Sequence, residues 1–295
     1  MRVTTAHLSW RCRERTLQLG ARPLVMGILN VTPDSFSDGG TYQDAAAAFR
    51  RGMEMAEAGA DIIDVGGEST RPGAEAVPGE VEAGRVIPVL RALAEAFAGK
   101  ASAPVLSVDT RKALVAREAL VAGADIVNDV TALTGDPAMA GVVCEYGAGV
   151  ILMHMRGDPT TMQQNPQYDD VVAEVTAYLA GRVEALKAAG LRAETMALDP
   201  GIGFGKSLDH NVKLIAGLRL LVALGHPVVI GLSRKSFISK ITGRDFSQRL
   251  AGSLAGAVWA AGQGAHVWRV HDVAESVDAA RVVEWLRKET TAWNG

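Results

Sequence analysis

The residues best suited to chemistry in this 295-residue sequence are polar side chains that follow short aliphatic segments. Asp109, Asn128 and Asp199 each supply hydrogen-bond acceptors at such a point. Two carboxylates brought into one buried site need hydrogen-bond donors or a cation beside them. A 2-amino-4-oxo heterocycle offers those donors, because its amidine edge can pair with a carboxylate through two hydrogen bonds, as a guanidinium does. These three residues therefore indicate a site for a flat, nitrogen-rich ring.

Three further residues can complete such a site. Lys235 can donate to the carbonyl oxygen or a ring nitrogen of the heterocycle, and Met153 and Phe204 can cover its faces. Each has a plainer interpretation when taken alone, since Met and Phe often pack in a core. An Asp at the end of a strand, such as Asp109 or Asp199, often caps the next helix or stabilises a turn. The plainer interpretation does not explain why so many polar groups of different types occur at strand ends.

A second set of residues is cationic. Arg71, Arg269 and His271 suit a phosphate or pyrophosphate, with Asn30 and the hydroxyl of Thr70 beside them. The sequence thus predicts an anion site next to the ring site.

Oxygen-bearing side chains around this anion site can also bind a hard cation. Asn30, Asp34 and Asp38 offer such oxygen atoms, and Mg2+ is commonly held by few protein ligands together with phosphate oxygens. The alternative for the two acids is a solvated loop. We therefore expect Mg2+ as cofactor, with Asn30 as a ligand and Asp38 as a further candidate. No Ser–His or Cys–His pairing is evident, so positioning and charge stabilisation are expected to replace covalent catalysis.

Short aliphatic segments must position these residues. Most are too short for helices and rich in Val, Ile and Leu, which is typical of parallel strands buried on both faces. The segments are Leu24–Asn30, Asp61–Gly67, Pro104–Thr110, Asp125–Val130, Gly149–Met155, Thr195–Gly201, Pro227–Ser233 and His266–Asp272. Segments of helical composition alternate with them. These are Asp44–Ala58, Glu80–Ala98, Arg111–Ala122, Pro137–Tyr146, Asp169–Ala189, Leu208–Leu224, Ser247–Ala261 and Val273–Lys288.

Strict alternation of strand and helix implies a parallel sheet. About eight such units indicate a closed (β/α)8 barrel of the TIM type, in which the polar strand ends meet at one mouth. A doubly wound open sheet is the alternative. Because no low-complexity linker divides the chain, we expect one barrel domain over residues 23–290, after an N-terminal lead-in of residues 1–22.

Composition limits the class of partner. A formal net charge of −3 gives no basic face for nucleic acid. Cys12 and Cys144 are far apart and fit no metal or redox spacing. Gly205-Lys206-Ser207 lacks the spacing of a nucleotide-binding loop. The sequence has no long apolar run and no signal-like N-terminus, so we expect no membrane segment and a cytoplasmic enzyme acting on small molecules.

Several stretches together resemble the dihydropteroate synthases of folate biosynthesis, and they cover nearly all of residues 24–288. They are MGILNVTPDSFSDGG (26–40), DVGGESTRPGA (64–74), SVDTRK (107–112), NDV (128–130), LMHMRG (152–157), DPGIGFGK (199–206), GLSRKSF (231–237) and RVHDV (269–273). The resemblance implies a (β/α)8 barrel, commonly a homodimer, that joins 6-hydroxymethyl-7,8-dihydropterin pyrophosphate to p-aminobenzoate with Mg2+. It also implies that sulfonamides compete at the p-aminobenzoate site, and that loops 31–40 and 69–75 close over the site.

The resemblance implies a role for each matching residue. The pterin would be held by Asp109, Asn128, Asp199 and Lys235, with Met153 and Phe204 against the ring. Pyrophosphate would meet Asn30, Thr70, Arg71, Arg269 and His271, while p-aminobenzoate would be bordered by Phe36, Thr70, Pro72 and Ser236. Asp109, Lys235, Arg269 and His271 would be the catalytic residues.

Two other functions share parts of this pattern. A pterin-binding methyltransferase that uses methyltetrahydrofolate has a similar barrel and a similar Asp/Asn/Asp set, but it would not need SRKS, RVHDV or the Asp-rich first loop. A non-catalytic pterin-binding relative would be expected to have lost Lys235, Arg269 or His271, and all three are present.

Overall fold

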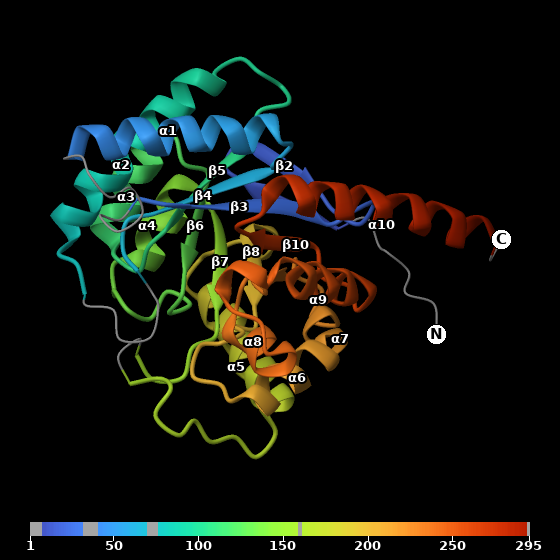
Figure 1. The fold of residues 1–295 in the computed structure, drawn as a ribbon. Helices are drawn as coiled ribbons and strands as arrows, with labels where there is room; N and C mark the ends of the chain where they lie inside the picture. The colour runs from blue at the N-terminus through green and yellow to red at the C-terminus, as the bar shows by residue number, and fades with distance from the viewer. Residues whose placement is uncertain (1–7, 32–40, 70–75, 159–160, 294–295) are drawn as a thin grey trace.

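Parallel strands form a closed barrel in the computed structural model, which describes residues 8–31, 41–69, 76–158 and 161–293. The strands are β3 (Leu24–Asn30), β4 (Ile62–Gly66), β5 (Val105–Asp109), β6 (Ile126–Asp129), β7 (Gly149–Met153), β8 (Met196–Asp199), β9 (Val229–Ile230) and β10 (Val267–Val270). Their order is β8-β7-β6-β5-β4-β3-β10-β9, and a parallel bridge between Leu198 and Val228 joins the two ends. The (β/α)8 barrel is therefore confirmed and the open sheet is wrong (Figure 1).

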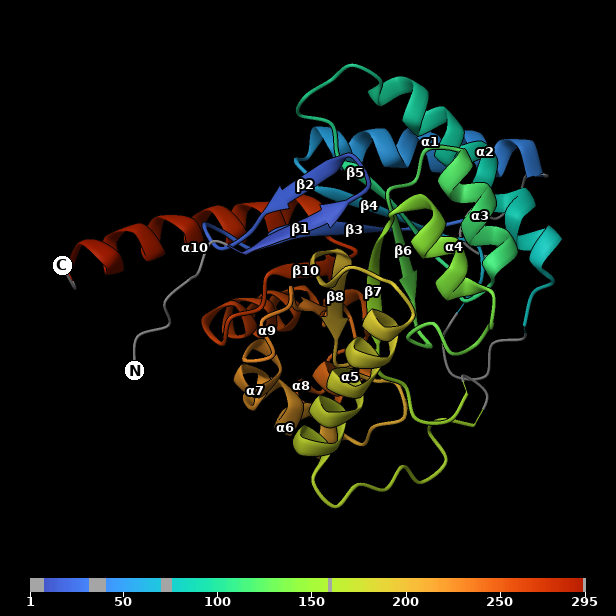
Figure 2. The same cartoon turned by 180° about the vertical axis from the view of Figure 1, so that it is seen from behind.

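Helices cover the outside of this barrel. They are α1 (Thr41–Glu57), α2 (Gly79–Phe97), α3 (Ala113–Val121), α4 (Met139–Tyr146), α5 (Val171–Ala188), α6 (Leu208–Ala216), α7 (Leu218–Val222), α8 (Ser236–Thr242), α9 (Leu250–Gly262) and α10 (Val273–Trp293). Short 3-10 turns span Ala193–Thr195 and Phe246–Gln248. Helix α10 reaches well past the rest of the molecule in both views (Figures 1 and 2).

The helices of the structure differ from the expected ones in two places. The segment Leu208–Leu224 is not one helix, because Gly217 ends α6 and begins α7. A Cβ at Gly217 would lie 2.9 Å from Val172 of α5, so the glycine also permits close packing of this bend. Helix α8 was not expected, since its seven residues are too few for a clear hydrophobic period.

Apolar side chains form two layers, one on each face of the sheet. The larger layer packs the outer face of the strands against the helices. The smaller layer fills the barrel itself with Met26, Ile62, Val105, Ile126, Ile151, Ala197, Val229 and Val267. A filled interior leaves the C-terminal ends of the strands as the place for a site.

A hairpin of residues within the N-terminal 22 closes the other end of the barrel. Strands β1 (Ser9–Cys12) and β2 (Arg15–Gln18) pair antiparallel, and the hairpin lies beside β3 in Figure 2. Trp10 and Cys12 are fully buried and join the inner apolar layer. The indole Nε1 of Trp10 donates to the carbonyl of Thr195 at 2.9 Å, which fastens the hairpin under β8.

Candidate active site

The predicted site residues within the described chain all occupy the last two positions of barrel strands or follow them. They are Asn30, Asp109, Asn128, Met153, Asp199, Phe204, Lys235, Ser236, Arg269 and His271. Phe36, Asp38, Thr70, Arg71 and Pro72 lie outside the described residues, as does Asp34. The mouth of the barrel can thus be followed from β3, β5, β6, β7, β8 and the loops after β9 and β10.

Buried acidic and amide groups meet at one side of the mouth. We call Asp64, Ser107, Asp109, Asn128 and Arg269 the carboxylate cluster. Nε of Arg269 lies 2.7 Å from Oδ2 of Asp64, and its Nη2 lies 2.6 Å from Oδ2 of Asp109. Asp64 also accepts hydrogen bonds from the hydroxyl of Ser107 at 2.6 Å and from Nδ2 of Asn128 at 3.0 Å. This pairing turns the amide oxygen of Asn128 away from Asp64, where it can accept from a ligand.

Sequence reasoning missed Asp64, the residue that joins this cluster. It is 1% exposed and lies in the middle of β4, inside an aliphatic run. The available signal was an acidic residue in the same strand phase as Ile62, which points into the barrel. A carboxylate there is costly unless it is paired, so its presence implies a partner from another strand.

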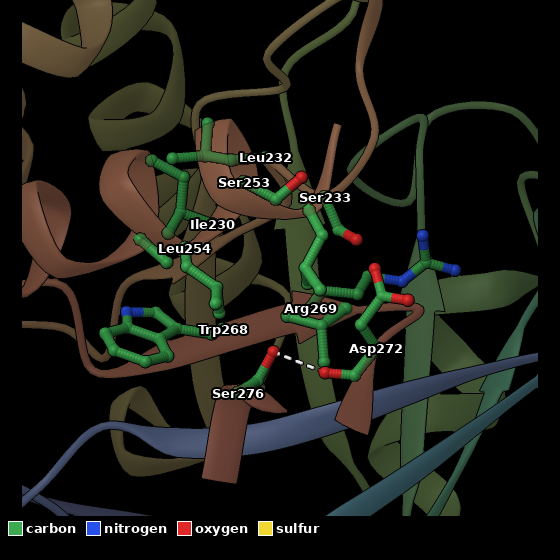
Figure 3. A pocket seen from close by; sticks show the side chains of 12 residues that line it. Ile230, Leu232, Ser233, Ser253, Leu254, Trp268, Arg269, Asp272 and Ser276 are labelled. Carbon is green, nitrogen blue, oxygen red and sulfur yellow. Dashed lines mark hydrogen bonds between the residues drawn. The ribbon is translucent and has the colours of Figure 1, made fainter. Parts of the chain in front are cut away.

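Arg269 occupies a different environment from the one expected. The sequence grouped it with Arg71 and His271 as an anion-binding cation, whereas the structure places its guanidinium between two carboxylates. Burial disfavours its charge, but Asp64 and Asp109 outweigh burial and raise the pKa of Arg269. Figure 3 shows the guanidinium pointing away from Trp268, its neighbour on β10. The small cavity beside Trp268, of about 10 Å3, has room for about one water molecule and not for a substrate.

The pKa of Asp109 is raised to about 7, chiefly because the carboxyl group is buried. Arg269 opposes this shift, and the charge of Asp64 adds to it. A group in this state can accept a hydrogen bond as an anion or share a proton near neutral pH. Such a perturbed acid at the mouth of a barrel is a feature typical of functional sites.

A lysine and a second carboxylate define the opposite side of the mouth. Nζ of Lys235 donates to the carbonyl of Ile202 and lies 4.4 Å from the ring centroid of Phe204. Burial lowers the pKa of Lys235 to about 8, against the attraction of Asp199. Burial likewise raises the pKa of Asp199, whose Oδ1 accepts from the backbone N–H of Gly201 at 2.7 Å. Asp109, Asp199 and Lys235 therefore each carry a charge that burial makes less stable.

The loops after β9 and β10 are tied together next to Lys235. Arg234 has a φ of +57° and its Nε donates to Oδ2 of Asp272 at 3.0 Å. The hydroxyl of Ser233 accepts from the backbone N–H of His271 and lies 3.1 Å from its Nδ1. Figure 3 shows Ser233 and Asp272 on the two neighbouring loops. These contacts fix the position of His271. Ser236 comes directly after Lys235 and is the exposed first residue of α8.

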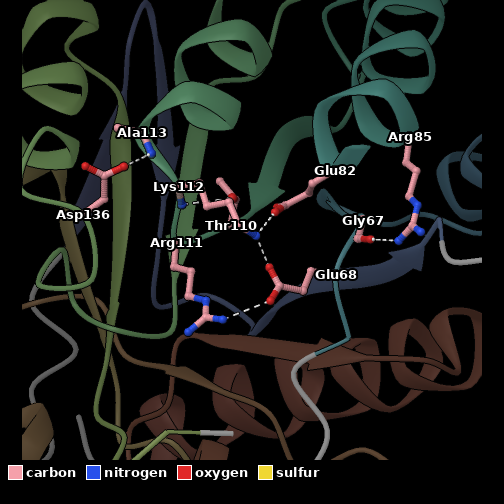
Figure 4. A network of polar contacts seen from close by, with 9 residues as sticks. All are labelled: Gly67, Glu68, Glu82, Arg85, Thr110, Arg111, Lys112, Ala113 and Asp136. Carbon is pink, nitrogen blue, oxygen red and sulfur yellow. Dashed lines mark hydrogen bonds and ion pairs between the residues drawn. The ribbon is translucent and has the colours of Figure 1, made fainter. Parts of the chain in front are cut away.

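An ionic network holds the chain directly before residues 70–75. Glu68 pairs with Nη2 of Arg111 at 3.0 Å and also with Lys112, which in turn pairs with the fully buried Glu82 of α2 (Figure 4). Burial opposes the charge of Glu68, but Lys112 and Arg111 lower its pKa overall. The loops after β4 and β5 are therefore joined by ion pairs. Sequence reasoning did not identify this network.

Neither a metal cluster nor a membrane span is found where the structure describes the chain. Within residues 8–31, 41–69, 76–158 and 161–293, no three His, Cys, Asp or Glu side chains are grouped to hold a metal ion. None of the helices in those ranges is long and apolar enough to cross a bilayer.

Comparisons with known proteins show the family to which the chain belongs. Residues 26–271 match the model of the family described as pterin binding enzyme. Dihydropteroate synthase of Escherichia coli strain K12 is 51% identical over 264 residues, which are 90% of this chain and 92% of that protein. The chain belongs to the dihydropteroate synthase family. This confirms the family that the motifs predicted.

Solved structures agree with the sequence comparison. A structure of Xanthomonas albilineans dihydropteroate synthase with 4-aminobenzoic acid has a TM-score of 0.87 at 48% identity, covering 96% of this chain and 99% of the other. Another structure of that enzyme, with 7,8-dihydropteroate, has a TM-score of 0.82 at 46% identity, with 95% and 98% covered. The dihydropteroate synthase family thus accounts for almost the whole length of the barrel.

Proposed function

We propose that this protein condenses 6-hydroxymethyl-7,8-dihydropterin pyrophosphate with p-aminobenzoate to give 7,8-dihydropteroate and pyrophosphate. The observation that carries the proposal is the set of buried Asp109, Asn128 and Asp199 with the half-buried Lys235 at the mouth of a barrel of this family. The relative from Xanthomonas albilineans, solved with 4-aminobenzoic acid and with 7,8-dihydropteroate, supports the same substrate and product.

The pterin is proposed to lie between the two sides of the mouth. Arg269 engages Oδ2 of Asp109, which leaves Oδ1 to accept from a ring nitrogen. The amide oxygen of Asn128 and the carboxylate of Asp199 accept from the other ring donors. Lys235 lies close enough to the ring of Phe204 for both to contact one flat ligand, and Met153 is the buried residue at the end of β7.

The leaving group and the second substrate are assigned to the rim. Pyrophosphate is proposed to bind Asn30, Thr70, Arg71, Arg269 and His271, and p-aminobenzoate to be bordered by Phe36, Thr70, Pro72 and Ser236. The guanidinium of Arg269 is paired with the carboxylates of Asp64 and Asp109, so it would contribute to pyrophosphate binding from that fixed position. Ser236 supports the p-aminobenzoate assignment, because it is exposed and directly follows Lys235.

The reaction needs a stabilised cation and a stabilised leaving group. The C–O bond to pyrophosphate breaks first, and its electron pair leaves with pyrophosphate. Asp109 and the other pterin acceptors stabilise the positive charge on the pterin methylene, while His271 and Arg269 stabilise the negative charge of pyrophosphate. The arylamine nitrogen then forms the new C–N bond and loses a proton. No nucleophile from the protein is required.

Mg2+ is proposed to bind together with pyrophosphate. The amide oxygen of Asn30 is one hard ligand at the end of β3, which fits an ion held largely by phosphate oxygens and water. Asp38 remains a further candidate outside the described residues. When bound, the ion would neutralise charge on the leaving group.

A homodimer is proposed from the surface of the last helices. Trp259 of α9 and Trp285 of α10 are exposed by 57% and 67%, and large apolar groups at a surface favour association. Light scattering after size-exclusion chromatography should give twice the 31.0 kDa mass of one chain. A mass of one chain at micromolar concentration would contradict the dimer.

The proposed reaction is tested by measuring pyrophosphate release and dihydropteroate formation from the dihydropterin pyrophosphate. The assay is run with and without p-aminobenzoate and with and without Mg2+. Both products, formed only when both additions are present, would establish the synthase. Binding of methyltetrahydrofolate without pyrophosphate release would favour the methyltransferase instead. Binding of the pterin pyrophosphate without turnover would identify a non-catalytic relative.

A further inference from the structure

Lys206, which follows β8, is a buried lysine whose ammonium group is surrounded by neutral acceptors. The residue is 2% exposed. Its Nζ lies 3.0 Å from Nδ1 of His154, 3.2 Å from the carbonyl of His154 and 2.9 Å from the carbonyl of Phe204. These three acceptors match the three N–H donors of an ammonium group. The mechanism above uses neither Lys206 nor His154.

The imidazole of His154 is held in one protonation state by its surroundings. It packs edge-on against the ring of Tyr178 at 5.0 Å and lies 6.2 Å from the ring of Tyr168. Burial, with the charge of Lys206, lowers the pKa of His154 to about 3. A neutral imidazole that accepts at Nδ1 carries its proton on Nε2. His154 is therefore uncharged at neutral pH and accepts at Nδ1 from the ammonium form of Lys206.

The two residues connect the loop after β7 with the loop after β8. His154 directly follows Met153, and Phe204 belongs to the loop that begins after Asp199. The loops are already in close contact, because a Cβ at Gly201 would lie 1.9 Å from the carbonyl oxygen of His154. A Cβ at Gly205 would lie 2.3 Å from the carbonyl oxygen of Arg156. Lys206 adds hydrogen bonds to both sides of this contact.

The β8 loop also sets the position of the other lysine of the mouth. The carbonyl of Ile202 accepts from Nζ of Lys235, and the ring of Phe204 lies beside that same nitrogen. A shift of the β8 loop would therefore move the acceptor of Lys235, the ring of Phe204 and the turn that follows Asp199 together. Lys206 and His154 supply buried polar contacts that oppose such a shift, beside the hydrogen bond that the hydroxyl of Tyr168 donates to the carbonyl of Gly205.

We propose that Lys206 and His154 form a positioning pair that fixes the β7 and β8 loops as one wall of the pterin pocket. This inference rests on the proposed function. The pair does not contact the pterin, and Lys206 is not a phosphate ligand, since its three donors already bind groups of the protein. The wall it fixes bears on the pterin ring and not on p-aminobenzoate.

The first test compares Lys206→Met with the wild type. Methionine keeps most of the buried volume and removes all three donors. We expect the KM for the dihydropterin pyrophosphate to rise roughly tenfold to a hundredfold, because small displacements of positioning groups have effects of this size. The KM for p-aminobenzoate should show no matching rise. Lys213→Met is the matched control, since Lys213 is exposed on α6 and pairs only at the surface with Asp209.

The second test uses His154 and remains informative if Lys206→Met does not fold. His154→Asn keeps an acceptor close to the position of Nδ1, whereas His154→Ala removes it. We expect His154→Asn to retain a pterin KM near that of the wild type and His154→Ala to raise it as Lys206→Met does. Equal KM values for the two folded variants, or an unchanged KM in folded Lys206→Met, would overturn the proposal.

Failure of the proposed function can be told apart from failure of this inference. A wild type that releases no pyrophosphate would reject the synthase reaction. Calorimetric titration with 6-hydroxymethyl-7,8-dihydropterin then measures the pocket directly. Weaker binding by Lys206→Met than by Lys213→Met would support the positioning pair, and equal binding would reject it.

Discussion

The two ends of the barrel are closed by opposite kinds of residue. At the mouth, Asp64, Asp109 and Arg269 are charged groups withdrawn from water, paired with one another across strands. At the floor, Trp10 and Cys12 of the N-terminal hairpin complete an apolar layer, with one hydrogen bond from the indole. Both ends are buried, but the fully buried side chains at the floor, Trp10 and Cys12, favour burial, while the half-buried Arg13 and Arg15 donate to carbonyls of the barrel.

This difference separates stability from function. Buried ion pairs contribute little net stability, because desolvation offsets their attraction. The pKa shifts of Asp109 and Lys235 show that burial disfavours both charged forms at the mouth. A ligand that supplies matching donors and acceptors relieves this cost, whereas Trp10 and Cys12 at the floor already pack in an apolar layer. Changes at the mouth should therefore affect activity first, and changes at the floor should affect folding first.

The largest expected effect comes from Asp109→Asn. The variant keeps the shape of the side chain but removes the negative charge that stabilises the pterin cation. We expect kcat to fall by about a hundredfold to a thousandfold, the range found when a group stabilising developing charge is removed. Pyrophosphate affinity should change far less. Product formation and pyrophosphate inhibition measure the two quantities.

Asp209→Asn serves as the control for this change, because Asp209 is exposed on α6. Equal losses of turnover and of pyrophosphate affinity in Asp109→Asn would contradict the assignment of Asp109 to the pterin side.

At the floor, Trp10→Ala should have the converse effect. The residue is fully buried, and removing a buried Trp side chain costs about 3 to 5 kcal/mol of unfolding free energy. The KM values of the folded fraction should stay near those of the wild type, since the hairpin lies at the end of the barrel away from the site. Urea unfolding and steady-state kinetics would check both statements. A pterin KM that rises in proportion to the lost stability would show that the two ends are not independent.

The pH dependence of kcat/KM tests the charges of Asp109 and Lys235 at the mouth, and the expected effect is smaller. The pKa of Asp109 is raised to about 7, so its anion is lost as the pH falls below that value. The pKa of Lys235 is lowered to about 8, so its charge is lost as the pH rises above that value. We expect a narrow bell between these values, each limb falling about tenfold per pH unit.

Two variants assign the limbs of this profile. Asp109→Asn should lose the acid limb. Lys235→Arg should remove the contribution of Lys235 to the alkaline limb, because arginine stays charged. Loss of charge from Lys206, whose pKa burial lowers to about 7, would act as the pH rises and cannot mimic the acid limb. An acid limb that persists in Asp109→Asn would reject Asp109 as its source.

The sequence predicted the barrel because each central strand is buried on both faces. Runs such as Ile62–Gly66 and Val105–Asp109 are mostly aliphatic, and their alternation with helices admits few topologies. The hairpin was missed for the opposite reason. Its strands have only four residues each and are apolar on one face, where Leu8, Trp10 and Cys12 alternate with polar residues, and that face is buried only by the interior of the closed barrel.

The site was predictable where chemistry follows strand ends and not where it depends on pairing. Asp109, Asn128 and Asp199 could be found from their positions alone. Asp64 and the partners of Arg269 could not, since which carboxylate a guanidinium meets is set by the register between strands far apart in sequence. Lys206 was likewise noted only for a motif it does not complete, because its acceptors come from the neighbouring loop.

The smallest expected effect comes from Trp10→Phe, which separates the two contributions at the floor. Phenylalanine keeps an aromatic ring in the inner layer but cannot donate to the carbonyl of Thr195. We expect a loss of about 1 kcal/mol of unfolding free energy, the size of one buried hydrogen bond, and no change in the pH profile of activity. Urea unfolding of this variant beside Trp10→Ala measures the difference. A loss as large as that of Trp10→Ala would mean that the hydrogen bond to Thr195, and not apolar packing, holds the hairpin on the barrel, and the floor would then resemble the mouth in depending on polar pairing.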